Sequence, residues 1–302
     1  MSKVRTLSFI GFGEAAQAFT AGFLKDNVAS DLCAYDIKTD GPEAEAFTDL
    51  YTSKGIKGCL SSEDACKGAD AIFSLVTAEE AERAACTAAE IELANSFFFD
   101  ANSCAPDTKR RSGKVVEAAG GRYVDVAIMT PVHPKLHKSP CLIAGPHAEA
   151  AALKMGEMGM NVQVAGPDIG DASTRKMIRS IMIKGLEALT LECLIAARKA
   201  GIEDEILHSL HTSYPGFGWP DKANYMLERV MSHGNRRAAE MREVVKTLHD
   251  LGVAADMTTG SVAWQSKVGA LGLDAQEIGA DNLAALSDAV IQAMDETERG
   301  QR

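Results

Sequence analysis

Short apolar runs alternate with amphipathic segments through the first half of the chain. Runs such as 5–10, 70–76 and 97–100 hold few charges, and the segments after them repeat apolar residues at helical spacing. Buried parallel strands have this continuous apolar character, and helices return the chain between them. The alternation therefore predicts a parallel, doubly wound sheet with right-handed crossovers. We expect strands at residues 5–10, 32–35, 56–60, 70–76, 97–100, 123–129, 141–144 and 162–164.

The pattern changes near Gly166. From Asp171 onward the apolar residues keep a helical period, and strong strand runs are absent. The longest such segment, 172–200, predicts a single helix that ends at Gly201. Further helices are expected at about 203–210, 221–232, 234–251, 255–271 and 282–297.

These two patterns predict an α/β chain of two domains. Residues 1–168 form a doubly wound nucleotide domain, and residues 169–302 form an all-helical domain. The segment 172–200 is too long and too apolar to be covered by the short helices that follow it. We therefore expect a homodimer, formed largely by the helical domain.

The first strand ends in a glycine turn that opens a helix. Gly11 permits the tight turn, Gly13 lets the backbone approach a ligand, and Ala16 lets the helix pack closely on the strand. The N–H groups and the positive dipole end of the helix then face an anion. The turn predicts a Rossmann-type dinucleotide site, the alternative being an ordinary tight turn. The cofactor-binding residues would be Gly11, Phe12, Gly13, Glu14 and Ala15.

An acidic residue, Asp36, ends the second apolar run. A carboxylate at this position can accept hydrogen bonds from both ribose hydroxyls of the adenosine half. It favours NAD, because it repels the 2′-phosphate of NADP. Lys38 could offset that repulsion, so NADP stays open as the alternative cofactor.

The composition excludes several classes of function. The 302 residues carry 31 lysines and arginines against 42 aspartates and glutamates, a net charge of −11. This balance argues against a general nucleic-acid or anionic-membrane binder. Seven cysteines without a CxxC pair are typical of reduced thiols, and seven histidines without an HExxH motif predict no metal. No apolar run could span a bilayer, and no signal peptide precedes the first strand, so we expect a cytoplasmic protein.

Polar residues follow three of the predicted strands. Ligands of doubly wound sheets bind beyond the carboxyl ends of the strands. Val76 and Thr77 stand at one such end, Asn102 at the next, and Met129 with Thr130 at a third. The alternative is that these are ordinary polar turns, with Asn102 capping the helix that follows.

The start of the long helix carries a stripe of polar residues. Lys176, Ser180 and Lys184 stand at i, i+4 and i+8, which places them on one face over about 12 Å. Apolar neighbours on other faces would carry these amines into a cleft. The alternative is a solvated helix face.

The order of these motifs resembles that of the β-hydroxyacid dehydrogenases, the family that includes 6-phosphogluconate dehydrogenase. Four stretches stand in register with its motifs: Gly11–Ala16 with the glycine fingerprint, Asp100–Pro106 with D-x-S-T-x-x-P, Asp125–Pro131 with the substrate motif D-x-P-V-S-G-G, and Gly170–Lys176 with G-x-G-x-x-x-K. The last motif carries the family's catalytic lysine. The resemblance, which covers nearly the whole chain, implies that Lys176 is the general acid and base.

The chain also departs from the family pattern. Met129 stands in place of the serine of the substrate motif, Thr130 in place of a glycine, and Ser180 in place of an asparagine. The family's K-D-L lysine has no clear match. The second half is similar to a divergent branch with a C-terminal domain of unknown function, through Ser213–Phe217 and Arg236–Met241. These departures argue against the substrates of the better-known members.

The resemblance implies an oxidoreductase that moves a hydride between nicotinamide and a small β-hydroxy acid or related acidic alcohol. Met129, Thr130, Ser180 and Lys184 would bind the substrate. Two alternatives stay open. One is reduction of an imine on the same fold, whose enzymes usually carry another residue at the position of Lys176. The other is a nucleotide-binding regulator without turnover.

Overall fold

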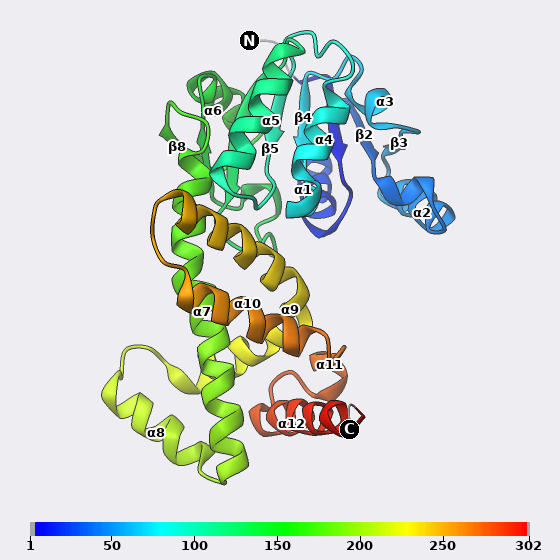
Figure 1. Ribbon diagram of the computed structural model, residues 1–302. Helices are drawn as coiled ribbons and strands as arrows, with labels where there is room; N and C mark the ends of the chain where they lie inside the picture. Colours follow the sequence, from blue (N-terminus) through cyan, green and yellow to red (C-terminus); the bar gives the residue numbers. More distant parts are fainter. Residues whose placement is uncertain (1–3, 301–302) are drawn as a thin grey trace. The chain divides into compact units, whose positions relative to one another are not determined.

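The computed structural model describes residues 4–300, which form an eight-stranded sheet followed by a run of helices (Figure 1). The strands are β1 (Thr6–Ile10), β2 (Asp31–Tyr35), β3 (Lys57–Gly58), β4 (Ala71–Ser74), β5 (Phe97–Asp100), β6 (Arg122–Ile128), β7 (Cys141–Ala144) and β8 (Val162–Gly166). Their order across the sheet is β3-β2-β1-β4-β5-β6-β7-β8. The winding direction reverses between β1 and β4, the place where such sheets bind ligands. The α/β class and the doubly wound N-terminal part are confirmed.

The last two strands depart from the parallel sheet that the sequence predicted. β6 pairs antiparallel with β7, and β7 pairs parallel with β8. A parallel connection needs a crossover that returns the chain to its starting edge, usually a helix. Between β6 and β7 the only regular element is the 3₁₀ helix η3 (Leu136–Lys138), so the chain turns back beside β6 instead.

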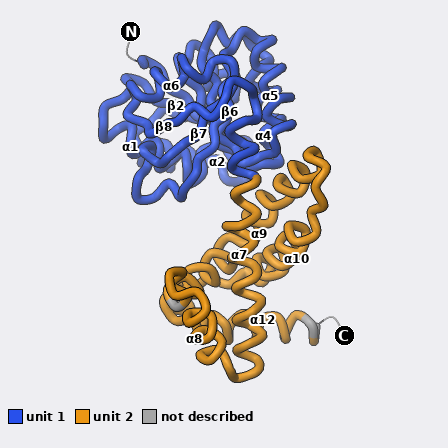
Figure 2. Tube along the Cα trace, turned by 90° about the vertical axis from the view of Figure 1, so that its left-hand side faces the viewer, with its two compact units in different colours: residues 1–177 blue, residues 178–302 orange. Residues whose placement is uncertain are grey.

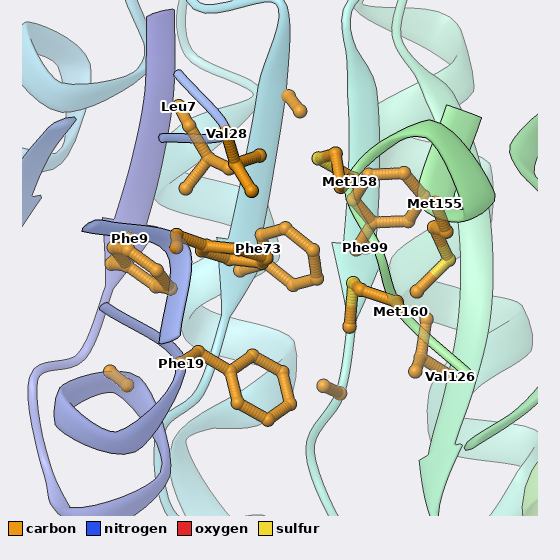
Figure 3. Close-up of a cluster of buried hydrophobic side chains, with 14 of the residues drawn as sticks. Leu7, Phe9, Phe19, Val28, Phe73, Phe99, Val126, Met155, Met158 and Met160 are labelled. Carbon is orange, nitrogen blue, oxygen red and sulfur yellow. The ribbon is translucent and has the colours of Figure 1, made fainter. Parts of the chain in front are cut away.

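Helices cover both faces of the sheet. On one face lie α1 (Glu14–Lys25), α2 (Ala44–Ser53) and α6 (Ala148–Glu157), and on the other lie α3 (Ser62–Cys66), α4 (Ala81–Ala88) and α5 (Pro106–Ala118). Successive strand residues alternate between two cores, so Phe99 packs on the first face and Phe98 on the second. Figure 3 shows the first core, where Phe19 of α1 and Met155 of α6 meet the strand side chains.

The second half of the described chain is helical, as predicted. Its elements are α7 (Asp171–Ala200), α8 (Glu203–Ser213), α9 (Trp219–Asp250), α10 (Asp256–Gly269), α11 (Ala275–Ile278) and α12 (Leu283–Gly300). The long helix predicted over 172–200 is confirmed. None of these helices, nor any other between residues 4 and 300, has the length and apolar character required to cross a membrane.

One long helix, α9, replaces two that the sequence predicted. The expected break near Gly234 does not occur, because this glycine serves a close helix crossing. A Cβ on Gly234 would lie 2.6 Å from the carbonyl oxygen of Gln265 and 2.7 Å from the Cα of Gly269, both in α10. The missing side chain lets the two backbones touch.

The chain divides into two compact units, residues 1–177 and 178–302 (Figure 2). The division falls inside α7, so Lys176 belongs to the first unit and Ser180 to the second. The second unit has a core of its own, in which Leu191 of α7, Leu227 of α9 and Val290 of α12 are buried together.

Candidate active site

The turn between β1 and α1 has the geometry of a phosphate cradle. Gly11 has a φ of +85°, and a Cβ there would lie 2.5 Å from the carbonyl oxygen of Leu75. Only glycine fits at that position. Gly13 is the N-cap of α1, and no side chain caps this helix. A Cβ on Gly13 would meet no atom within 4 Å, so space remains beside the positive end of the helix.

The other residues of the turn that the sequence predicts to bind the cofactor are Phe12, Glu14 and Ala15. The ring of Phe12 is fully buried, with its centroid 5.1 Å from that of Tyr51. Its N–H donates a hydrogen bond of 2.7 Å to Oδ2 of Asp36. Glu14 and Ala15 form the first turn of α1, where Glu14 is exposed.

Asp36 is held at the end of β2, next to the glycine turn. Its Oδ2 accepts from Phe12, and its Oδ1 accepts from the N–H of Lys38 at 3.1 Å. Each carboxylate oxygen can accept a second hydrogen bond, so the group can still receive a ribose hydroxyl. The ammonium of Lys38 lies 3.1 Å from the carboxylate of Glu43.

The ends of β4 and β5 meet through Asn102. The N–H of Val76 donates to Oδ1 of Asn102 at 2.7 Å, and Nδ2 of Asn102 donates to Ser74 at 2.9 Å and to Asp100 at 2.8 Å. Asn102 does not cap the next helix, because the N-cap of α5 is Ala105. Thr77 follows as the N-cap of the short 3₁₀ helix η2 (Ala78–Glu80).

Lys176 reaches the loop after β5. Its Nζ donates a hydrogen bond of 2.5 Å to Oγ of Ser103, the residue that follows Asn102. The ammonium also acts on Cys141 of β7: burial raises the pKa of this thiol to about 12, and the charge of Lys176 opposes that rise. The structure therefore brings Lys176 to the carboxyl end of β5.

The two residues predicted after β6 lie in the same unit as Lys176. The N–H of Met129 donates to the carbonyl of Pro140 at 2.9 Å. The Met129 side chain packs against a small cluster that includes Ala172 in the first turn of α7. Oγ1 of Thr130 donates to the carbonyl of Pro131 at 3.2 Å, and the residue is exposed.

Beneath these residues lies a buried charged network that the sequence reasoning missed. Nζ of Lys109 in α5 lies 2.9 Å from Oδ1 of Asp100 and 3.5 Å from Oδ1 of Asp125, and all three side chains are inaccessible. Tyr123 donates to Oδ2 of Asp100 at 2.7 Å. One signal was available: Lys109 stands at i, i+4 and i+7 spacing with Gly113 and Val116, on the face of α5 that is buried.

Two members of this network, Lys109 and Tyr123, have shifted pKa values. Burial acts to lower the pKa of Lys109, but the charges of Asp100 and Asp125 outweigh it, so the pKa lies above its usual value. Burial, and then the same two carboxylates, raise the pKa of Tyr123 well above the usual value. Lys109 is therefore a cation and Tyr123 a neutral donor at physiological pH.

Ser180 and Lys184 lie farther along α7, in the second unit. Both are buried. The ammonium of Lys184 forms an ion pair with Glu240 of α9, and its backbone carbonyl accepts a hydrogen bond from Gln265 of α10 at 3.1 Å. Lys184 is thus engaged inside the helical unit, where any substrate anion would compete with the carboxylate of Glu240.

Within residues 4–300, no group of three histidine, cysteine, aspartate or glutamate side chains is arranged to hold a metal ion. The ionisable groups gathered near the glycine turn and the ends of the strands are instead Asp36, Lys176 and the network around Lys109. These groups suit a dinucleotide and proton transfer.

Two family models match the chain. A model described as NADP oxidoreductase, coenzyme F420-dependent, matches residues 6–101. A domain of unknown function matches residues 197–268.

Solved structures match nearly the whole length. A conserved hypothetical protein from Sinorhizobium meliloti is 33% identical, with 97% of each chain covered and a TM-score of 0.72. A conserved protein of unknown function, described as structurally similar to 3-hydroxyacid dehydrogenases, is 27% identical, with 95% of this chain and 99% of the other covered and a TM-score of 0.66.

Two enzymes share the fold at lower identity. A 3-hydroxyisobutyrate dehydrogenase from Mycobacterium tuberculosis, solved with L-serine, is 15% identical, with 96% of this chain and 99% of that one covered and a TM-score of 0.71. A reductive aminase from Aspergillus terreus, solved with NADPH, is 17% identical, with 95% of this chain and 99% of that one covered and a TM-score of 0.57. The fold is thus that of NAD(P)-binding oxidoreductases of the 3-hydroxyacid dehydrogenase and imine reductase type.

Proposed function

The chain belongs to the 3-hydroxyacid dehydrogenase-like family, in the branch whose C-terminal domain has no known function, and we propose that it is an NAD(P)-dependent oxidoreductase acting on a CH–OH group. Its substrate would be a small β-hydroxy acid or related acidic alcohol. The observation that carries this proposal is the placement of Lys176 against Ser103, at the carboxyl end of β5 and next to Asn102.

The glycine turn and Asp36 fit a dinucleotide. The open space beside Gly13 and the uncapped end of α1 would receive the diphosphate, and Asp36 would accept hydrogen bonds from the adenosine ribose. Val76, Thr77 and Asn102 at the strand ends would line the nicotinamide half. The nicotinamide supplies the hydride chemistry, and the protein supplies position and electrostatics.

Lys176 would act as the general acid and base. In the oxidation direction its neutral amine takes the proton that the substrate hydroxyl loses, and in reduction its ammonium returns that proton to the carbonyl oxygen. Ser103 holds Nζ at the end of β5, so the amine is oriented before a substrate arrives. Met129 and Thr130, from the neighbouring strand end, would contact the substrate.

We propose NAD as the preferred cofactor. Two backbone N–H groups fix the carboxylate of Asp36 at the end of β2, and a carboxylate bound to the adenosine ribose would repel a 2′-phosphate. The nearest cation in sequence, Lys38, is directed to Glu43 and lies 5.6 Å from the ring centroid of Phe47. Its ammonium is therefore poorly placed to compensate a phosphate.

We also propose that the protein works as a homodimer. The residues at i, i+4, i+11, i+15 and i+18 along α7 form an exposed apolar stripe on one side of the helix. The stripe consists of Ile178, Met182, Leu189, Cys193 and Ala196. An apolar face of this length on a single helix is typical of an association surface. A second copy of the chain would cover it.

Reduction of a C=N bond is the second candidate, because a reductive aminase shares the fold. An assay that follows absorbance at 340 nm distinguishes the two activities. NADH and NADPH are tested with a panel of oxo acids, and NAD and NADP with a panel of hydroxy acids. The same assay with ketone and amine pairs tests the second reading. We expect turnover with the hydroxy acids, abolished in Lys176→Ala. Turnover only with the ketone and amine pairs would establish C=N reduction instead.

A further inference from the structure

We infer that Lys109 is a positioning residue of the proposed active site, because its buried ammonium joins the loop that carries Asn102 and Ser103 to the turn that carries Lys176. The inference rests on the proposed function. It extends the site to a residue that contacts neither the substrate nor the cofactor.

Stability alone is a poor reason for this network. Three charged side chains with no accessible surface have lost their hydration, and buried ion pairs are seldom more stabilising than apolar side chains of similar size. On α5 the residues in line with Lys109 are small or apolar, and the strands on this face of the sheet contribute Ile72, Phe98 and Tyr123 to the same core. An apolar residue would fit at the same position. The presence of an ammonium is therefore better explained by the two carboxylates that it holds in place, Asp100 and Asp125.

On one side the ammonium holds Asn102 through Asp100. Nζ donates to the backbone carbonyl of Asp100 at 2.5 Å and to its Oδ1 at 2.9 Å. The same Oδ1 accepts from the backbone N–H of Asn102 at 3.1 Å and from its Nδ2 at 2.8 Å. The amide of Asn102 therefore has one orientation, with its oxygen turned to the N–H of Val76.

On the other side the ammonium holds the start of α7 through Asp125. Oδ2 of Asp125 accepts from the N–H of Gly170 at 3.2 Å, and from the N–H and Oγ of Ser173 at 3.0 and 3.1 Å. A carboxylate from β6 thus caps α7, where the helix dipole favours negative charge. Lys176 follows Ser173 by three residues, less than one turn.

The ammonium of Lys109 compensates the charge on the second carboxylate oxygen of Asp125. Among the residues that the structure describes, Oδ1 of Asp125 has no hydrogen-bond donor, and the ammonium at 3.5 Å is its compensating charge. Without that charge, Asp125 would be a buried carboxylate with no compensating cation, and the capped turn of α7 would lose its anchor. The Lys176 to Ser103 hydrogen bond spans the two parts that Lys109 connects.

The test compares Lys109→Met with Lys114→Met, an exposed lysine on the same helix that serves as the matched control. Amide hydrogen exchange is followed in peptides that cover residues 74–78 and 168–176, and kcat and the NADH Kd are measured on the same samples. We expect exchange in both peptides of Lys109→Met to rise at least about 10-fold, with kcat lower by about 10- to 100-fold and Kd nearly unchanged. Lys114→Met should behave as the wild type.

The following results would overturn the inference. Unchanged exchange in the two peptides, or equal acceleration across residues 1–177, would show that Lys109 supports only the fold. If Lys109→Met does not fold, the double variant Lys109→Met/Asp125→Asn keeps the buried net charge of the wild type, and unchanged exchange in its two peptides would overturn the inference. Hydrogen exchange does not need turnover, so it decides this inference even if no panel substrate reacts, a result that would overturn the proposed function alone.

Discussion

Nζ of Lys176 donates a hydrogen bond to Oγ of Ser103, a residue 73 positions earlier in the chain. Two segments that the sequence suggested for separate reasons, a strand end and the start of a long helix, therefore meet at one point. The contact lies wholly inside the first compact unit. It places the proposed acid and base next to the asparagine that we assign to the nicotinamide side.

Replacing Lys176 should remove catalysis without removing the cofactor. Lys176→Ala is expected to lower kcat by at least about 10²-fold, the low end for loss of a general acid and base, with NADH affinity retained. Lys176→Arg should not restore turnover, because a guanidinium does not release its proton near neutral pH. Steady-state kinetics and calorimetry measure the two effects.

The comparison for Lys176 is Lys184→Ala. This variant breaks the ion pair with Glu240, so we expect a lower Tm and a raised KM, with a smaller loss of kcat. If Lys184→Ala abolishes turnover while Lys176→Ala remains active, the role assigned to Lys176 belongs two turns farther along α7.

Substitution of the two glycines of the turn should have different effects, one on cofactor affinity and the other on stability. A side chain on Gly13 meets only open space, so Gly13→Val should fold normally and lose at least about 10-fold in NADH affinity by blocking the diphosphate. A side chain on Gly11 collides with the backbone at Leu75 and needs a left-handed conformation, so Gly11→Val should lose stability. Calorimetry and thermal unfolding tell the two apart. Wild-type affinity in a folded Gly13→Val would remove the diphosphate assignment.

Asp36 should set the choice of cofactor. Asp36→Ser removes the charge that opposes a 2′-phosphate, so the ratio of kcat/KM for NADPH over NADH should rise by about 10-fold or more. Asp40→Ser, an exposed carboxylate four residues later, is the control and should leave the ratio unchanged. An unaltered ratio in Asp36→Ser would mean that this carboxylate does not face the ribose.

The apolar stripe on α7 should control the oligomeric state. Met182→Glu places a charge in the middle of the stripe and should convert a dimer to a monomer at micromolar concentration in sedimentation velocity. Ile183→Glu changes a neighbouring exposed side chain that points about 100° away, and should leave the dimer intact. A wild-type protein that sediments as a monomer would contradict the proposal.

His137 should make the stability depend on pH. Burial lowers the pKa of this imidazole despite the nearby carboxylate of Asp26, and the charge of Lys138 acts in the same direction as burial. Below a pH of about 6.5 the unfolded chain takes up a proton that the folded chain refuses, so the free energy of unfolding falls as the pH falls.

The slope from this one group is at most about 1.4 kcal/mol per pH unit. Urea unfolding between pH 7.5 and 5.5 measures it. His137→Gln should flatten the curve, whereas His208→Gln, at an exposed position, should not. A slope that survives in His137→Gln would assign the effect to another group.

Local signals were enough for the parts of the fold that depend on neighbours in sequence. The glycine turn at Gly11 and Gly13, the acidic end of β2 and the 30-residue helix α7 all follow from short-range pattern. The direction of β7 did not follow from such a pattern. It depends on the absence of a crossover helix between β6 and β7. The continuity of α9 through Gly234 depends on a distant partner, Gly269, that no window of sequence contains.

The same limit applies to the candidate site. Lys176 and Asn102 could be chosen from the sequence, but their link through Ser103, Asp100 and Lys109 needs three elements brought together. Lysines usually lie on solvated helix faces, so the residue type alone does not indicate that Lys109 is buried. Its burial is decided by two carboxylates on neighbouring strands, and only the sheet order shows that they are neighbours.

The position of β5 in the sheet has a consequence for handling the protein. Its run Phe97, Phe98 and Phe99 is a strongly β-forming, uncharged segment of the kind that stacks into fibrils when exposed. Between β4 and β6, with helices over both faces, the run is inaccessible to another chain. The run is protected only while the domain is folded. Heating that opens it would present the segment to other molecules, so thermal denaturation should end in aggregation rather than refolding.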